Sequence, residues 1–196
     1  MKIEPTKFPD VYVLTPNVYG DSRGYFHEVY QKERFHAFGL TSEFVQDNLS
    51  KSAKRVLRGL HFQWNPHQGK LVRAVKGKIF DVVVDIKRGS PTFGQWTSVE
   101  LSEENHKMFW IPPGYAHGFL TLSDEVILEY KCTGTWNGDS EASIRYDDPE
   151  IGIVWPLSDA IVSEKDLEGM SLREWAENEN FGVFNDTLPP ILKLES

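Results

Sequence analysis

The sequence predicts an all-β sandwich or barrel, and three observations support this fold class. Short apolar runs recur between glycine, proline, asparagine and aspartate residues, which is the pattern of many short strands joined by turns. The chain contains 6 Trp, 7 Tyr and 12 Phe, and aromatic side chains favour strands and flat binding walls. Helix signals occur in only two regions. Because 196 residues suffice to build a core, we expect one domain over residues 1–196.

The predicted strands follow one another along most of the chain. They cover residues 11–14, 25–30, 43–48, 56–63, 71–76, 78–86, 95–101, 108–111, 118–122, 126–131 and 143–146. Gly77 separates two of these strands and lies where a tight turn needs a positive φ. We therefore expect residues 71–86 to form a β-hairpin.

A few short helices are expected at the periphery. Residues 31–38 have a helical composition and are followed by Gly39, a residue type common at helix C-termini. Ser163 and Ser171 can each begin a helical turn, and Ser171 with Glu174 has the spacing of a capping box. Beyond residue 177 the chain becomes polar and then proline-rich, so we expect residues 177–196 to form a surface tail.

Charge and cysteine content narrow the function classes. The chain has 21 Lys and Arg against 29 Asp and Glu, a net charge of −8, and no basic run, which argues against a nucleic-acid partner. Cys132 is the single cysteine and cannot form an internal disulfide, so we predict a reducing compartment, the cytoplasm. The N-terminus lacks an apolar signal core, and no stretch approaches the ~20 apolar residues that span a bilayer, so no membrane partner is predicted.

An arginine, a histidine and a lysine interrupt apolar, strand-like runs near the middle of the chain. Arg58, His61 and Lys70 are costly to bury there unless they find partners. They form either a satisfied core histidine with solvent-facing cations, or a functional site. In a regular strand Arg58 and His61 face opposite sides. Either a bulge at Gly59 turns one of them, or the two residues serve different surfaces.

A Pro-x-Gly-x-x-His element that ends at His117 is similar to the second sequence motif of cupins, the small jelly-roll barrels. In that family the motif turns a strand corner and directs its histidine into the barrel. Metal-binding cupins add His-x-His and a glutamate from a first motif. Here that place is His61-Phe62-Gln63, and Lys70 follows without a suitable carboxylate. Because a metal needs at least three good ligands, we predict no metal site.

Strand alternation gives a second candidate group inside the barrel. Val126, Leu128 and Tyr130 share one face of a predicted strand, which we expect to point inward. A tyrosine there is either a core residue whose hydroxyl finds one partner or, beside a histidine and a lysine, a proton donor.

Several ordered blocks resemble the nucleotide-sugar epimerases typified by dTDP-4-dehydrorhamnose 3,5-epimerase. The blocks are Gly-Asp-Ser-Arg-Gly-Tyr-Phe at 20–26, Phe-Val-Gln-Asp-Asn at 44–48, Val-Leu-Arg-Gly-Leu-His-Phe-Gln at 56–63, Gln-Gly-Lys-Leu-Val-Arg at 68–73, Ser-Pro-Thr-Phe-Gly-Gln-Trp at 90–96, Gly-Tyr-Ala-His-Gly-Phe at 114–119, Ile-Gly-Ile-Val-Trp-Pro at 151–156 and Ser-Glu-Lys-Asp at 163–166. The resemblance covers nearly the whole chain. It implies a cupin-type jelly-roll barrel with a few short peripheral helices, no metal or organic cofactor, and a homodimer formed by exchange of N-terminal strands.

The resemblance also implies a reaction. dTDP-4-dehydro-6-deoxy-D-glucose would lose and regain protons at C3 and C5 to give dTDP-4-dehydro-L-rhamnose. A C–H bond beside a carbonyl is a weak acid, so the enzyme must supply a base, stabilise the enolate oxygen and return a proton to the opposite face. By the family's pattern His61 is the base, and Asp166 fixes its tautomer. Tyr130 is the proton donor and Lys70 lies near the C4 oxygen.

Further positions match the family's substrate-binding residues. Arg23, Arg58 and Lys165 resemble its contacts to the pyrophosphate, a role that suits cations with several donors. Matches to the nucleoside-binding segment and to other binding positions are Gln46, Asp47, Asn48, Phe26, Glu28, His117 and Glu141.

One departure from the family's pattern bears on specificity. Trp136 replaces a tyrosine found in many members, and it offers a larger stacking face without a hydroxyl, so base selectivity or the extent of epimerisation can differ. The nearest alternative is therefore an epimerase that inverts C3 or C5 only. Less favoured are a metal-dependent cupin enzyme and a non-catalytic sugar-nucleotide binder, since binding alone would not require His61, Lys70, Tyr130 and Asp166 together.

Overall fold

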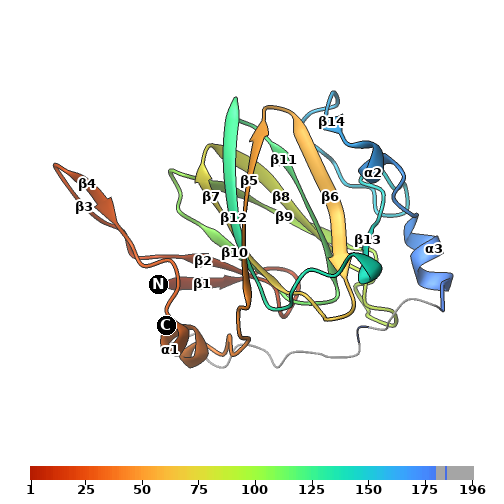
Figure 1. Cartoon of the computed structure of the whole chain (residues 1–196), viewed down its shortest axis with the longest axis horizontal. Helices are drawn as coiled ribbons and strands as arrows, with labels where there is room; N and C mark the ends of the chain where they lie inside the picture. Colours follow the sequence, from red (N-terminus) through yellow and green to blue (C-terminus); the bar gives the residue numbers. More distant parts are fainter. Residues whose placement is uncertain (180–183, 185–196) are drawn as a thin grey trace.

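Two antiparallel sheets packed face to face form the body of the protein in the computed structural model, which describes residues 1–179 and 184 (Figure 1). The first sheet has the strand order β1 (Lys2–Pro5), β2 (Tyr12–Thr15), β10 (Met108–Ile111), β7 (Lys70–Lys76), β12 (Glu125–Cys132) and β5 (Gln46–Ala53). The second has the order β13 (Glu141–Ser143), β6 (Val56–Gln63), β11 (Tyr115–Thr121), β8 (Lys78–Asp85) and β9 (Trp96–Ser102), and β14 (Ile161–Val162) pairs in parallel with β6. Residues 180–183 and 185–196 of the predicted tail lie outside the described residues.

Side-chain alternation sorts the apolar residues into three layers. The layer between the sheets holds residues such as Val72 and Val83. The outer face of the second sheet packs against Trp175, and that of the first sheet packs against Phe35. The sheets therefore enclose one core and carry a smaller apolar layer on each outer face.

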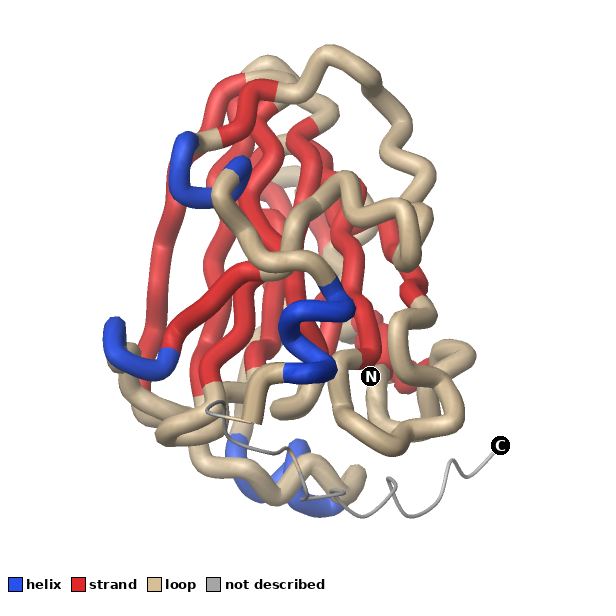
Figure 2. The backbone as a smooth tube through the Cα atoms, turned by 90° about the vertical axis from the view of Figure 1, so that its right-hand side faces the viewer, coloured by secondary structure: helices blue, strands red, loops and turns tan. Residues whose placement is uncertain are grey.

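The helices are short and lie outside the strand framework, one of them in front of the strands in the view of Figure 2. They are α1 (Lys32–Ala37), the 3-10 turn η1 (Gly138–Ser140), α2 (Glu164–Leu167) and α3 (Leu172–Glu177). The predicted capping box is confirmed, because Ser171 and Glu174 each accept from the other's backbone N–H. None of the helices in the part of the chain that the structure describes has the length and apolar character that a membrane crossing needs.

The expected hairpin over residues 71–86 is wrong. β7 pairs with β10 and β12, whereas β8 pairs with β11 and β9, so the two strands belong to different sheets. Gly77 does adopt a positive φ of 73°, and its N–H donates to Glu103. The same turn chemistry serves a hairpin or a corner between sheets. The partners available from elsewhere in the chain decide which one forms.

The predicted strand boundaries agree best with the observed ones for strands that lie inside the sheets. The predicted strands 56–63 and 108–111 coincide with β6 and β10. Residues 25–30 are strand only to Phe26, residues 43–48 begin pairing only at Gln46, and residues 143–146 are replaced by β13, which ends at Ser143. These differences occur at edges, where the number of paired residues depends on the neighbouring strand and not on local propensity.

A β-bulge in β6 settles how Arg58 and His61 are directed. His117 of β11 lies opposite His61, and Phe119 lies opposite Arg58, so three steps along β6 match two steps along β11. The extra residue brings Arg58 and His61 to one face of the strand. Gly59 lies within this irregularity at a φ of 123°, with its Cα against the backbone of Gly118.

A two-stranded arm, β3 (Tyr19–Asp21) and β4 (Gly24–Phe26), projects away from the barrel (Figure 1). Its aromatic residues are largely exposed, with 65% of Tyr19, 60% of Tyr25 and 68% of Phe26 accessible. Large aromatic side chains concentrated on an extended arm mark an interaction surface.

We expect Gly59→Ala to lower the free energy of unfolding by about 3 kcal/mol, because the new Cβ would lie 2.5 Å from the Gly118 Cα at a strained positive φ. Gly89→Ala is the matched control. Gly89 also has a positive φ, of 81°, but nothing lies within 4 Å of its Cβ position, so a loss of about 1 kcal/mol is expected. Urea unfolding of both variants measures the difference, and equal losses would show that the bulge tolerates a side chain.

Candidate active site

A histidine–carboxylate pair lies on the bulged strand. The Nε2 atom of His61 is 2.6 Å from the Oδ1 atom of Asp166, which α2 supplies. Asp166 is only 3% exposed and also accepts from the Gly59 N–H at 3.3 Å. A carboxylate in this position holds the imidazole proton on Nε2 and leaves the Nδ1 lone pair as the basic group.

The ionised form of Asp166 is favoured despite its burial. Burial acts to raise the pKa of Asp166, but hydrogen bonds from His61, the Gly59 N–H and Ser163 outweigh it and lower the pKa below its ordinary value. A firmly ionised carboxylate can orient the imidazole and stabilise the imidazolium after a proton is taken up.

A cleft opens beside this pair. Its lining comes from β6, β14 and the start of α2, and consists of Val56, Leu57, Arg58, His61, Ile161, Val162, Ser163, Lys165 and Asp166. Arg58 is anchored by donating from Nε to the Ser52 Oγ at 3.1 Å. The cleft therefore combines a basic imidazole with two cationic side chains, an arrangement that suits an anionic ligand.

Lys70 and Tyr130 occupy the inner face of the first sheet. Lys70 lies opposite Cys132 in the register of β7 and β12, and Tyr130 lies opposite Asn48 and Val72. Burial lowers the pKa of the Lys70 ammonium, while burial raises the pKa of the Tyr130 phenol. The inward direction predicted for Tyr130 is confirmed, since its ring packs against the core between the sheets.

Polar and aromatic side chains at or just beyond the ends of β5, β12 and β13 and at the start of α2 form the rim of the same interior. They are Gln46, Asn48, Trp136, Glu141 and Lys165. The backbone N–H of Trp136 donates to the Gln46 Oε1 at 2.9 Å, and the Gln46 Nε2 donates to the Asn48 Oδ1 at 3.0 Å. Lys165 donates to Glu141 at 2.7 Å. The Trp136 side chain is 63% exposed and leaves a flat aromatic face open to a ligand.

His117 lies deeper, where it meets a residue that the sequence analysis missed. Its Nε2 atom is 2.9 Å from the Oδ1 of Asp81 and 3.1 Å from the Oδ2, and both residues are buried. The signal in the sequence was a carboxylate between the apolar Ile79 and Val83 on the inward face of β8, a face that ends at a second carboxylate, Asp85. Burial raises the pKa of Asp81, and His117 and Lys70 oppose that shift.

Four of the predicted binding residues are not brought to this interior within one chain. Arg23 and Phe26 lie on the projecting arm, and Arg23 forms an ion pair with Asp21. Glu28 follows the arm and pairs with Arg34 of α1 at 3.3 Å. The fourth residue, Asp47, lies on the outward face of β5.

Asp47 alternates with Gln46 and Asn48 along β5 and therefore faces outward. Its carboxylate accepts from Lys131 at 2.9 Å on the outer face of the first sheet. The block Phe-Val-Gln-Asp-Asn thus contributes its two amides to the interior, whereas the acid between them belongs to a surface ion pair.

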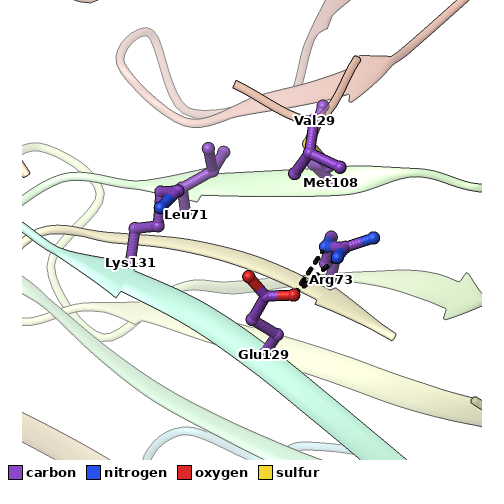
Figure 3. Close-up of a pocket in the computed structure, with 6 residues that line it drawn as sticks. All are labelled: Val29, Leu71, Arg73, Met108, Glu129 and Lys131. Carbon is purple, nitrogen blue, oxygen red and sulfur yellow. Dashed lines mark hydrogen bonds and ion pairs between the residues drawn. The ribbon is translucent and has the colours of Figure 1, made fainter. Parts of the chain in front are cut away.

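A small pocket on that outer face is separate from the site. It is lined by Val29, Leu71, Arg73, Met108, Glu129 and Lys131 (Figure 3). Arg73 donates to Glu129 within the pocket at 3.1 Å, and Lys131 donates to Asp47 beside it. Leu71 and Glu129 face outward because they alternate with the inward Lys70 and Tyr130.

Metal-ligating side chains do not gather in the described part of the chain, where no three His, Cys, Asp or Glu residues lie close enough to share an ion. The absence of a metal and of an organic cofactor in the reaction stays a prediction.

The comparison with known families identifies this arrangement. A family model described as dTDP-4-dehydrorhamnose 3,5-epimerase matches residues 5–174. The chain belongs to this family. The match spans both sheets and the helix that supplies Asp166, so it covers every element of the interior site.

Individual relatives agree with the family match. A dTDP-4-dehydrorhamnose 3,5-epimerase from Methanothermobacter thermautotrophicus is 51% identical over 86% of this chain and 93% of its own length. A crystal structure of dTDP-6-deoxy-D-glucose-3,5-epimerase from Legionella pneumophila, in complex with dTDP-4-keto-L-rhamnose, superposes with a TM-score of 0.86 at 48% identity, covering 88% of this chain and 93% of that one.

A more distant epimerase keeps the same fold. A 4-keto-6-deoxy sugar epimerase from the novobiocin biosynthetic gene cluster of Streptomyces spheroides has a TM-score of 0.89 at 35% identity, with 94% of each chain covered. The predicted fold class, an all-β cupin-type jelly-roll barrel with a few short peripheral helices, is confirmed.

We expect Asp166→Asn to destabilise the protein in a pH-dependent way. The lowered pKa means that the Asp166 contribution to folding is complete above the unfolded-state value of about 3.9 and is lost as pH falls through the folded-state value. Urea unfolding at neutral pH and at about pH 2.5 should show the gap between wild type and variant narrowing only at the acidic end.

Asp139→Asn changes an exposed aspartate and is the control for this measurement. It should leave the free energy of unfolding close to that of wild type at both pH values. A gap for Asp166→Asn that stays constant with pH would contradict the role of its ionised form.

Proposed function

We propose that this protein converts dTDP-4-dehydro-6-deoxy-D-glucose into dTDP-4-dehydro-L-rhamnose by inverting C3 and C5 without a cofactor. The observation that carries the proposal is the oriented His61–Asp166 pair, on a barrel whose interior also presents the half-buried side chains of Lys70 and Tyr130. Family membership supports the same reaction.

The first step is removal of a proton beside the ketone. The Nδ1 atom of His61 accepts the proton from carbon, and the C–H electron pair moves toward the carbonyl to form an enolate. Asp166, hydrogen-bonded at Nε2, stabilises the imidazolium that results. This assigns the base and its positioning group to β6 and α2.

The second requirement is stabilisation of the negative charge on the C4 oxygen. Lys70 extends from β7 into the interior, where low polarity strengthens the attraction between an ammonium and an oxyanion. The Tyr130 phenol then returns a proton to the face opposite the base. Its raised pKa keeps the phenol protonated and able to donate.

The remaining polar groups suit the nucleotide. Arg58 and Lys165 line the cleft beside His61, where they would bind the diphosphate. The Gln46 and Asn48 amides and the exposed Trp136 ring would hold the base by hydrogen bonding and stacking. His117 and Glu141 complete the sugar-facing interior in this proposal.

A homodimer formed through the β3–β4 arm accounts for the residues that one chain leaves outside its interior. Arg23 and Phe26 lie on this arm, away from the barrel (Figure 1). An arm exchanged between two copies would place them at the partner's site, as expected for a symmetric interface. In such a dimer, Asp47 and Glu28 would bind substrate only from outside the barrel interior that holds His61.

We also propose a small-molecule partner and a cytoplasmic location. The net charge of −8 supports a small-molecule partner in preference to nucleic acid. The free, buried Cys132 fits a reducing compartment, and we propose the cytoplasm.

Deuterium uptake tests the proposed reaction directly. The protein is incubated with dTDP-4-dehydro-6-deoxy-D-glucose in heavy water without added metal, and each carbon is followed by NMR. Label at both C3 and C5, with the L-sugar trapped by reduction, is the expected result. Label at one carbon would instead make the protein a mono-epimerase, and no label would exclude this substrate.

We expect His61→Asn to slow deuterium uptake by about a thousandfold or more, since the general base is lost. Binding of dTDP, measured by calorimetry, should be nearly unchanged because asparagine keeps a polar group of similar size. Near wild-type exchange by the variant would show that another residue is the base.

Mixed dimers test the exchange of arms. We expect a dimer with Arg23→Ala on one protomer and His61→Asn on the other to retain about half the wild-type rate, because one of its two sites is intact if Arg23 acts on the partner. The control dimer carries both substitutions on one protomer and wild type on the other. It should be nearly inactive, and the reverse pattern would show that each arm serves its own barrel.

A further inference from the structure

The loop between β12 and β13 carries Trp136 and is fixed by a buried amide of β6. The Gln63 side chain is only 3% exposed. Its Nε2 atom donates to the Thr135 carbonyl at 2.9 Å and to the Pro66 carbonyl at 2.8 Å, and its Oε1 atom accepts from the Asn137 N–H at 2.8 Å. One side chain therefore contacts the backbone on both sides of Trp136.

These bonds hold the Gln63 amide in one orientation. Both of its N–H groups have carbonyl acceptors and its oxygen has an N–H donor, so exchanging the N and O atoms would place donors against donors. Because the amide is buried, a movement of the loop would leave these polar groups without hydrogen bonds. The backbone of the loop is thus tied to β6.

A second glutamine fixes the residue between these two contacts. The Gln46 Oε1 atom accepts from the Trp136 backbone N–H at 2.9 Å, and the Gln46 Nε2 atom donates to the Asn48 Oδ1 at 3.0 Å. Backbone groups of three consecutive residues, 135–137, are therefore bonded to side chains from β5 and β6. This anchoring determines the direction in which the indole leaves the loop.

The indole lies close to a residue that has no side chain. A Cβ atom on Gly138 would lie 3.2 Å from both the Cζ2 and the Cη2 atoms of Trp136. Carbon atoms in ordinary contact are about 3.5–4.0 Å apart, so a methyl group there would push the ring away. Gly138 does not adopt a positive φ, so its backbone conformation does not call for glycine. The nearby ring is the reason that the structure supplies.

We propose that Gln63 and Gly138 are positioning residues that hold the Trp136 indole as a preformed stacking platform for the nucleoside base. Gln63 fixes the backbone, and Gly138 leaves room for the ring beside the loop. The ring, with 63% of the residue exposed, then meets the base without rearranging, which lowers the entropic cost of binding. The inference rests on the proposed function, in which Trp136 stacks on the base.

One strand serves both the platform and the chemistry. His61 and Gln63 are two residues apart on β6 and lie on the same face of the strand. The position of the bound nucleoside relative to the imidazole is therefore set by strand backbone and not by a free loop. Loss of the Gln63 amide should weaken nucleotide binding more than it slows proton transfer.

A double-mutant cycle on Gly138 and Trp136 tests the platform. Calorimetry measures the Kd for dTDP in wild type, Gly138→Ala, Trp136→Tyr and the double variant. We expect Gly138→Ala to raise Kd about fivefold in the wild-type background, since a displaced ring loses part of the base–aromatic stack. A tyrosine ring lacks the Cζ2 and Cη2 atoms. In the Trp136→Tyr background, Gly138→Ala should therefore change Kd by less than about twofold.

Asp139→Ala is the control for a substitution in this turn. Asp139 follows Gly138 in η1 and is exposed, so the change should leave Kd within about twofold of wild type. No effect of Gly138→Ala in the wild-type background would overturn the role of Gly138. Equal effects in the two backgrounds would overturn it as well, because the ring of Trp136 would then not be the group that the methyl displaces.

Gln63→Met tests the contacts to the loop backbone, because methionine keeps the length of the side chain without its hydrogen bonds. We expect KM for the nucleotide sugar and Kd for dTDP to rise about tenfold, while kcat for deuterium exchange changes less than about threefold. Gln68→Met is the matched control. Gln68 donates to the Gly134 carbonyl at 2.9 Å, before the anchored segment, so Kd should rise less than about twofold. A fall in kcat with unchanged Kd in Gln63→Met contradicts a positioning role.

Binding and turnover distinguish a failure of this inference from a failure of the proposed function. The expected Kd values in a protein that takes up no deuterium support the platform and overturn only the proposed reaction. Normal deuterium uptake, with Kd values for dTDP that do not respond to Gly138→Ala or Gln63→Met, overturns the platform and leaves the reaction in place.

Discussion

The hydrogen bond between His61 and Asp166 is the interaction on which the rest of the site depends. It joins the bulged strand β6 to a helix that lies 105 residues further along the chain. The same carboxylate accepts from the Gly59 N–H, and β14 pairs in parallel with β6 directly before α2. The bulge, the late parallel strand and the short helix therefore form one unit, which both builds a wall of the cleft and orients the imidazole.

Burial sets the chemistry of the interior by favouring neutral forms. It lowers the pKa of Lys70 and raises those of Tyr130, Cys132 and Asp81. An acid-base enzyme needs some of these groups charged and others neutral, so specific partners must counteract burial where charge is required. Asp166 and Glu141 show the pattern, since hydrogen-bond donors hold both carboxylates ionised. The interior thus holds the neutral Tyr130 phenol and Cys132 thiol on the same barrel as the ionised carboxylates of Asp166 and Glu141.

The framework is that of a cupin, but the positions that metal-binding cupins use for ligands carry other chemistry. His61 is followed two residues later by Gln63, whose side chain donates to the carbonyls of Pro66 and Thr135. His117 is engaged by Asp81. The outer faces of the sheets are also used, because α1 and α3 cover them with apolar residues and leave the projecting arm as the most exposed aromatic surface.

The sequence by itself determined the fold class, the central strands, the capping box at Ser171 and the set of chemical groups, because alternation, turn residues and ordered motifs are local properties of the chain. It left open whether Arg58 and His61 share a face, and it predicted a hairpin where the chain in fact crosses between sheets at Gly77. It also missed Asp81 and did not show that Asp47 faces outward. Those outcomes depend on which distant strand pairs with which, on one extra residue in β6 and on the desolvation of groups that meet only when the sheets close. Only the tertiary structure decides these, because pairing, register and burial are set by partners far away in the sequence.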